Sequence, residues 1–219
     1  MNKSFAILAF LATTLAAGAV MAQALPEVKT GDKLTWLYTL YNDNAKQIIP
    51  LLTKEEVAVV TVNPASGDRE YTYTDGTKLV TNNQFGPKKA RDIRIFNENE
   101  MFNVLQGDPV IGQKWSFEAS QQVMSALQPR CTIMQFFLTA TVLPGPTVTI
   151  RVRGVDTPVK TFLVKQEGKR YYNPCTSGPA YFNYLYSPEL KEVVEKEYFS
   201  YNRSVVHTDS SKTTLRAID

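Results

Sequence analysis

The chain has 219 residues, of which 43% are hydrophobic and 11% aromatic, and its formal net charge at pH 7 is +3. This length suffices for one domain of ordinary size or two small ones. A net charge so close to neutral argues against nucleic acid as a partner. Eleven Tyr and eleven Phe residues favour a pleated sheet over a helix bundle, because aromatic side chains pack well on a pleated surface.

Residues 1–24 have the three-part pattern of a secretory signal peptide. Lys3 supplies the positive charge, residues 5–15 form an uncharged apolar run, and small residues allow cleavage after Ala22 or Ala24. The run is too short for a bilayer span, which needs about 20 residues. We therefore expect a mature protein without a transmembrane segment, located in the bacterial periplasm or secreted.

In the mature chain, residues 31–41 are predicted to form a first strand, with Leu34 and Trp36 on the same face. Residues 42–52 have room for a single helical turn, because a proline prevents a longer helix. Residues 57–62 form a short apolar run that predicts a well-buried strand.

Two predicted hairpins have clear turn residues. Residues 71–81 surround Asp75-Gly76, a pair that suits the positive φ angles of a two-residue type I′ turn. Residues 181–201 contain two aromatic-rich runs on either side of Ser187-Pro188, which predicts an antiparallel hairpin near the end of the domain.

Further strand patterns lie between these hairpins. Residues 147–153 alternate between apolar and polar side chains, which is typical of an antiparallel strand with one buried face. Residues 161–172 predict another hairpin around Glu167-Gly168. Because strand patterns recur about every ten residues with turn residues between them, we expect an all-β fold, an antiparallel β-sandwich or a partly open barrel.

Cys131 and Cys175 are the two cysteines. A disulfide between them is the first expectation in an oxidising compartment, with free thiols as the alternative. They make a poor metal site, because only His207 could complete it. A bridge of this loop length should stabilise the fold by about 4 kcal/mol.

Two stretches begin alike, with Gly, polar, Lys, apolar, hydroxyl and aromatic residues at residues 31–36 and 112–117. The pattern suggests two similar halves, residues 25–107 and 108–205, within a β-domain of residues 25–205. Independent origin of similar strand starts is the alternative.

Residues 206–219 are polar, and we expect them to form a flexible tail. His207, the single histidine, lies at the start of this segment. Catalysis by a Ser-His or Cys-His pair would have to use it, and its position in a predicted tail argues against that role.

Three motifs follow one another in the second half: Gly112-Gln-Lys-Trp115, Val155-Asp-Thr-Pro-Val-Lys-Thr-Phe162 and Tyr184-Leu-Tyr-Ser-Pro-Glu-Leu-Lys191. Over about residues 109–200, the chain resembles the C-terminal half of several uncharacterised families of exported bacterial β-proteins. It departs from their pattern at Val159-Lys160, where a Gly usually precedes the Thr-Phe pair. The resemblance implies an envelope location and a β-fold, and it implies no particular chemistry.

Aromatic residues are concentrated in the last predicted hairpin. They are candidates for a surface that binds a ligand or a partner, because tyrosine combines apolar area with a hydrogen-bonding tip. The alternative is that they form the core and cross-strand pairs. Strand alternation places Tyr181 on the face opposite Phe182. The candidate surface comprises Tyr181, Phe182, Tyr184, Tyr186, Tyr198 and Tyr201.

The sequence contains no signature of a catalytic, metal or cofactor site. We therefore expect a non-catalytic, exported β-domain without a cofactor, which binds an envelope protein or an apolar ligand. A periplasmic carrier of lipid or other hydrophobic cargo is the first alternative. The second is a hydrolase that uses Glu195 and Glu197, which lie on the same side of one predicted strand. A large internal cavity would favour the carrier, and two carboxyl groups converging in a cleft would favour the hydrolase.

Overall fold

The computed structural model describes residues 25–44, 47–89, 103–122, 133–173, 176–201 and 207–219. This part of the chain consists of strands and connecting turns, and none of it is helical. No helix suited by length and hydropathy to cross a membrane occurs among these residues. The strands are β1 (Lys33–Asn44), β2 (Gln47–Val62), β3 (Arg69–Tyr73), β4 (Lys78–Thr81), β5 (Pro87–Lys89), β6 (Lys114–Gln122), β7 (Ile133–Pro144), β8 (Val148–Val152), β9 (Val155–Val159), β10 (Phe162–Asn173), β11 (Thr176–Ser187), β12 (Glu192–Tyr201) and β13 (His207–Ile218).

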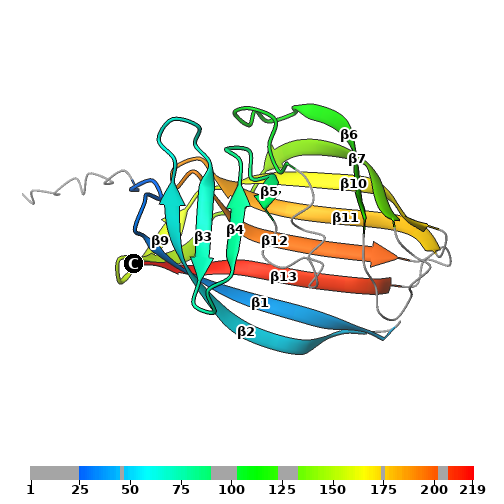
Figure 1. The fold of residues 1–219 in the computed structure, drawn as a ribbon, viewed down its shortest axis with the longest axis horizontal. Helices are drawn as coiled ribbons and strands as arrows, with labels where there is room; N and C mark the ends of the chain where they lie inside the picture. Colours follow the sequence, from blue (N-terminus) through cyan, green and yellow to red (C-terminus); the bar gives the residue numbers. More distant parts are fainter. Residues whose placement is uncertain (1–24, 45–46, 90–102, 123–132, 174–175, 202–206) are drawn as a thin grey trace, which may run out of the picture.

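The strands form one sheet in the order β5-β4-β3-β2-β1-β13-β12-β11-β10-β7-β6, and the β8–β9 hairpin joins it through β13. The pairing is antiparallel except between β8 and β13. Figure 1 shows the long strands β10 to β13 and β1 side by side, with β3 and β4 crossing in front of them near one end. The sheet curls over without closing, so its end strands are β5 and β6. The predicted all-β, partly open architecture is confirmed.

Two clusters of buried side chains fill the curled sheet. The first, which we call the aromatic core, contains Phe136, Phe182 and Tyr184 and is covered by Trp115 and Phe117 of β6. The second, which we call the aliphatic core, is built on β1 to β4, on the β8–β9 hairpin and on parts of β11 to β13. Its members include Leu34, Trp36, Val60, Leu79, Ile150, Val159 and Leu215.

The two predicted strand starts share the same backbone structure. Gly31 and Gly112 both have positive φ angles, +95° and +88°, which favour glycine. The Gly31 amide donates to the Val60 carbonyl at 2.9 Å, and the Gly112 amide donates to the Val142 carbonyl at 2.9 Å. Each valine amide then donates, at 3.0 Å, to the carbonyl of the residue that follows the glycine.

The residue after each glycine also makes an equivalent side-chain bond. Asp32 Oδ2 accepts from the Lys29 amide at 2.9 Å, and Gln113 Oε1 accepts from the Val110 amide at 3.2 Å. The sequence similarity between residues 31–36 and 112–117 therefore reflects one way of turning the chain into a strand.

The predicted flexible tail at residues 206–219 is wrong. Residues His207–Ile218 form β13, which lies between β1 and β12 in the sheet; residue 206 is outside the described residues. Leu215 and Ile218 are buried in the aliphatic core. A strand inside a sheet is held by backbone hydrogen bonds on both edges, so it needs few apolar side chains, and the threonines of this segment suit a strand.

The predicted hairpin around Glu167-Gly168 is also wrong, because β10 runs through both residues without a turn. Gly168 pairs with Leu138 of β7 and Ala180 of β11. A Cβ atom on Gly168 would lie 2.0 Å from the Phe137 carbonyl oxygen. Glycine is therefore required for the close approach of β7 and not for a turn.

Three smaller expectations have mixed outcomes. The hairpin over residues 181–201 is confirmed as β11 and β12. Residues 42–44 belong to β1 and residues 47–52 to β2, so the predicted helical turn is wrong for these residues. Residues 45–46 lie outside what the structure describes. Residues 57–62 are buried on one face only, since Val60 is inaccessible while Val59 is 45% exposed.

The hairpin over residues 71–81 is confirmed as β3 and β4, but its turn differs from the expected type. The Tyr73 amide donates to the Thr77 carbonyl at 2.9 Å, which leaves a three-residue loop. In this loop Gly76 has a positive φ angle and Asp75 does not. The pattern is a type I turn followed by a left-handed glycine.

Candidate functional site

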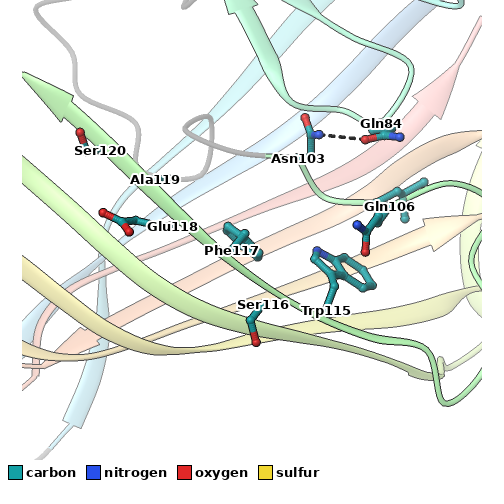
Figure 2. A pocket seen from close by; sticks show the side chains of 10 residues that line it. Gln84, Asn103, Gln106, Trp115, Ser116, Phe117, Glu118, Ala119 and Ser120 are labelled. Carbon is teal, nitrogen blue, oxygen red and sulfur yellow. Dashed lines mark hydrogen bonds between the residues drawn. The ribbon is translucent and has the colours of Figure 1, made fainter.

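The sheet leaves a groove where its two ends approach each other (Figure 2). One wall is formed by residues 115–120 of β6, and the other by Gln84, Asn103, Leu105 and Gln106. Gln84 lies in the loop between β4 and β5, at the opposite end of the sheet from β6. The groove has a volume of about 450 Å³. We call it the seam groove.

Strand β6 gives the seam groove a wall with two kinds of surface. Trp115 and Phe117 are half-buried and pack against the aromatic core, while Ser116 and Glu118 alternate with them and are exposed. Figure 2 shows the Trp115 ring turned toward Gln106 and the Ser116 hydroxyl turned to the other side of the strand. Within the part of the chain that the structure describes, β6 pairs only with β7.

The opposite wall is fixed by hydrogen bonds between two loops. The Gln84 carbonyl accepts from the amides of Val104 and Leu105 at 3.0 and 3.2 Å. Asn103 Nδ2 donates to Gln84 Oε1 at 2.8 Å, and Asn82 Nδ2 donates to Asn103 Oδ1 at 2.8 Å. These bonds connect the β4–β5 loop to the segment that leads into β6.

Two further residues hold this wall in place. Gln166 of β10 is fully buried, and its Nε2 donates to the carbonyls of Asn103 and Val104 at 3.1 and 3.4 Å. A Cβ atom on Gly86 would lie 1.8 Å from Asn103 Oδ1, so glycine is required where the two loops meet. The wall thus contacts the β4–β5 loop and is also hydrogen-bonded to β10.

Phe85 anchors the same loop in the aromatic core. Its φ angle is +60°, a conformation that costs a bulky residue about 1–3 kcal/mol. Its ring is buried and packs edge-to-face on Tyr186, with centroids 5.8 Å apart. The Arg69 guanidinium covers the ring at 4.8 Å from the centroid. Burial and these contacts offset the backbone strain.

A buried ion pair lies beside Phe85. Arg69 Nε is 3.6 Å from Glu192 Oε2, and Arg69 also donates to the Lys191 carbonyl at 2.8 Å. The Tyr71 hydroxyl lies 3.0 and 3.1 Å from the two Glu192 carboxylate oxygens. Burial raises the pKa of Glu192, and the Arg69 charge opposes this in part. These residues connect β3 to β12 and do not line the seam groove.

Most of the predicted aromatic surface is in the core. Phe182, Tyr184, Tyr186 and Tyr198 all belong to the aromatic core, where Phe182 stacks on Tyr198 with centroids 4.6 Å apart. Burial raises the pKa of Tyr184 well above its ordinary range. The structure therefore places these four rings in the core, which is the alternative to a binding surface that the sequence left open.

The other two members of the predicted surface differ. Tyr181 is half-buried and alternates with Phe182 along β11, as expected for the opposite face. The Tyr201 side chain lies outside what the structure describes. The predicted surface is therefore not brought together as one exposed patch by the described side chains.

The two carboxylates considered for hydrolysis have separate partners. Lys212 Nζ is 2.8 Å from Glu195 Oε1, and Asn183 Nδ2 donates to Glu197 Oε2 at 3.1 Å. Neither carboxylate lines the seam groove. Among the described residues, no group of three or more His, Cys, Asp and Glu side chains could hold a metal ion.

Cys131, Cys175 and the His207 side chain lie outside what the structure describes, so the predicted disulfide is not observed directly.

Sequence reasoning did not identify the seam groove. The available signal was the strict alternation of residues 114–120, which predicts a strand with one apolar and one polar face. That pattern cannot show that β6 ends the sheet, or that Gln84 faces it across the groove.

The fold and the groove define an all-β protein with one curled, open sheet and an amphipathic groove at its seam. No family model matches the chain. No curated protein matches it. Among solved structures, the hypothetical lipoprotein YmcC from Escherichia coli K12 is similar over 84% of this chain and 83% of its own, with 10% identity and a TM-score of 0.45. A candidate lipoprotein from Parabacteroides distasonis is similar over 89% and 97%, with 13% identity and a TM-score of 0.35.

Proposed function

We propose that this protein is an exported, non-catalytic component of the bacterial cell envelope that binds a ligand or a segment of a partner in its seam groove. The observation that carries the proposal is the groove itself. Its volume of about 450 Å³ lies in the range of ligand sites, about 300–1,000 Å³. Its walls are held by hydrogen bonds before any ligand arrives, which reduces the cost of ordering them on binding.

The lining favours an amphipathic molecule over a purely apolar one. Trp115, Phe117 and Leu105 supply apolar surface, while Gln84 and Gln106 are among the polar side chains around it. A hydrocarbon chain would offer no hydrogen bond to the amide nitrogen of Gln84 or to the side chain of Gln106, which is unfavourable for polar groups taken out of water. We therefore prefer a ligand or partner with hydrogen-bonding groups to the hydrophobic cargo of a lipid carrier.

The envelope location rests on two observations from the sequence. Residues 1–24 have the pattern of a secretory signal, and about residues 109–200 resemble exported bacterial β-proteins. The non-catalytic assignment is supported by Glu195 and Glu197, which bind different neighbours and do not line the groove.

Native mass spectrometry of the protein purified from the periplasm of producing cells tests this proposal. We expect the protein to retain an added mass, and we expect Trp115→Ala to lose it because the substitution removes a large aromatic ring from the groove. Phe137→Ala is the matched control, since Phe137 is an exposed aromatic residue of β7 that does not line the groove. Equal retention by the Trp115→Ala variant, or no bound species in any form of the protein, would overturn the proposal.

A further inference from the structure

We propose that the ligand of the seam groove is a neutral, extended oligosaccharide; this inference rests on the proposed function and specifies its ligand class. The described lining carries little charge. Among the described residues that line the groove, Glu118 is the single ionisable side chain, and none is Lys, Arg or His. An anionic ligand such as a nucleic acid, a phospholipid headgroup or an acidic peptide would find no opposite charge among these residues.

The hydrogen-bonding groups on the wall opposite β6 also suit a sugar. Gln84, Asn103 and Gln106 provide side-chain amides there. Amides both donate and accept hydrogen bonds. Sugar hydroxyls do the same, and they are arranged in neighbouring pairs that amide side chains can bridge.

The walls are also rigid enough to select such a ligand. The side-chain oxygen of Gln84, Oε1, accepts a hydrogen bond from Asn103, so the side-chain nitrogen of Gln84 remains as a donor. Gln113 Nε2 donates to the Gln106 carbonyl at 2.8 Å and fixes the backbone that carries the Gln106 side chain. Donors and acceptors held in this way recognise a ligand by its pattern of hydroxyl groups.

A pair of aromatic rings on β6 also suits a sugar. Trp115 and Phe117 alternate with polar residues, so they lie on one side of the strand, about 7 Å apart along it. The C–H faces of sugar rings are apolar and pack on the negatively polarised face of an aromatic ring. Aromatic rings on one wall and side-chain amides on the other therefore match the apolar faces and the hydroxyl groups of a sugar.

The groove is also long. It follows six consecutive residues of β6, 115–120, whose Cα atoms span about 17 Å at the usual rise of a strand. An elongated ligand of several sugar units fits this shape better than a single compact molecule. A peptide could also lie along β6, but it would bind mainly through backbone hydrogen bonds and would depend little on the amide side chains.

The chain is well suited to a fluorescence test, because it has only two tryptophans. Trp36 is buried in the aliphatic core, so a Trp36→Phe variant leaves Trp115 as the sole reporter. We would titrate this variant with neutral tetra- to hexasaccharides of glucose, galactose and mannose, with acidic oligosaccharides, with a neutral alkyl glycoside and with an extended peptide library. We expect a neutral oligosaccharide to change the Trp115 emission in a saturable way.

Calorimetry on the wild-type protein then locates the binding. We expect Trp115→Ala and Gln106→Ala each to weaken the binding of that oligosaccharide by about tenfold or more, as for central contacts of other interfaces. Phe137→Ala should leave it unchanged. Binding that is equally strong in Trp115→Ala places the sugar elsewhere and overturns the inference.

The remaining outcomes separate this inference from the proposed function. If an acidic sugar, an alkyl chain or a peptide binds in a Trp115-dependent way and neutral oligosaccharides do not, the ligand class is wrong and the seam groove is still a binding site. If no class binds in a Trp115-dependent way and native mass spectrometry shows no retained species, both proposals fail.

Discussion

Arg69 and Glu192 form an ion pair in which both side chains are almost inaccessible, with relative exposures of 6% and 2%. Arg69 comes from β3, in the part of the sheet that crosses in front of the long strands, and Glu192 begins β12. The pair therefore connects two regions that are far apart in the sequence and are not neighbours in the sheet.

We expect Arg69→Met to reduce the free energy of unfolding by about 3–5 kcal/mol, because it leaves the buried Glu192 carboxylate without its compensating charge. Urea unfolding at pH 7 measures this change. The double variant Arg69→Met/Glu192→Leu removes both charges and should recover at least part of the loss. A double variant no more stable than Arg69→Met would show that the two groups are not coupled.

The stability of the protein should also depend on pH through Glu192. Burial raises its pKa in the folded protein above the value in the unfolded chain. A carboxyl group of this kind stabilises the fold below its ordinary pKa, and that contribution is lost as pH rises through the raised pKa. Glu192→Gln lacks the titration, so relative to wild type it should become more stable as pH rises from about 4.

Urea unfolding of wild type and Glu192→Gln at a series of pH values tests this prediction. The two curves of unfolding free energy against pH should diverge in favour of the variant toward neutral pH. Parallel curves would mean that Glu192 does not titrate differently in the folded and unfolded states.

Gly168 provides a test of the close approach between β10 and β7. We expect Gly168→Ala to cost about 3 kcal/mol, because its Cβ would lie 2.0 Å from the Phe137 carbonyl and must push the strand away. Gly76→Ala is the control: its Cβ meets no atom within 4 Å, so only the positive φ angle is penalised, by about 1–2 kcal/mol. Thermal or urea unfolding would contradict the prediction if the two variants were equally stable.

Thr213 tests whether the C-terminal segment is a strand. It pairs with Tyr38 of β1 and Lys196 of β12. Proline at this position removes a backbone donor from the middle of a sheet, so we expect Thr213→Pro to cost at least about 3 kcal/mol. Thr213→Ala keeps the donor and should be nearly neutral. Similar stability of both variants would indicate that β13 contributes little.

The disulfide expected between Cys131 and Cys175 rests on the sequence, because both cysteines lie outside the described residues.

We expect peptide mapping under non-reducing conditions to recover Cys131 linked to Cys175. Cys131→Ser/Cys175→Ser should lower the free energy of unfolding by about 4 kcal/mol. Two thiols that react fully with a thiol reagent in the denatured, unreduced protein would rule out the bridge.

Local signals located the β3–β4 and β11–β12 hairpins, because the turn residues of these connections lie within the segments that they join. Alternation also assigned Phe182 and Tyr181 correctly to opposite faces of β11. Neither signal shows which face is covered, so rings that form a core could be taken for a surface. Gly168 illustrates the same problem, because the sequence does not show whether a glycine is needed for close packing or for a turn.

The seam groove and β13 depend on pairing between distant segments. Nothing within residues 207–218 indicates that β1 and β12 lie on either side of them. Likewise, the groove joins Gln84 to residues 115–120, and their proximity follows from how the whole sheet curls. A single sequence contains little information about such contacts, because the hydrophobic pattern of a strand does not indicate which other strands pair with it.

The place of β13 in the sheet has a consequence for how the protein folds. Leu34 of β1 pairs with Ile218 of β13, which lies 184 positions later in the chain. Strand β1 therefore acquires this neighbour only after a very long loop has closed. Contacts between such distant segments are costly in chain entropy, so we expect this part of the sheet to form late and folding to be slow.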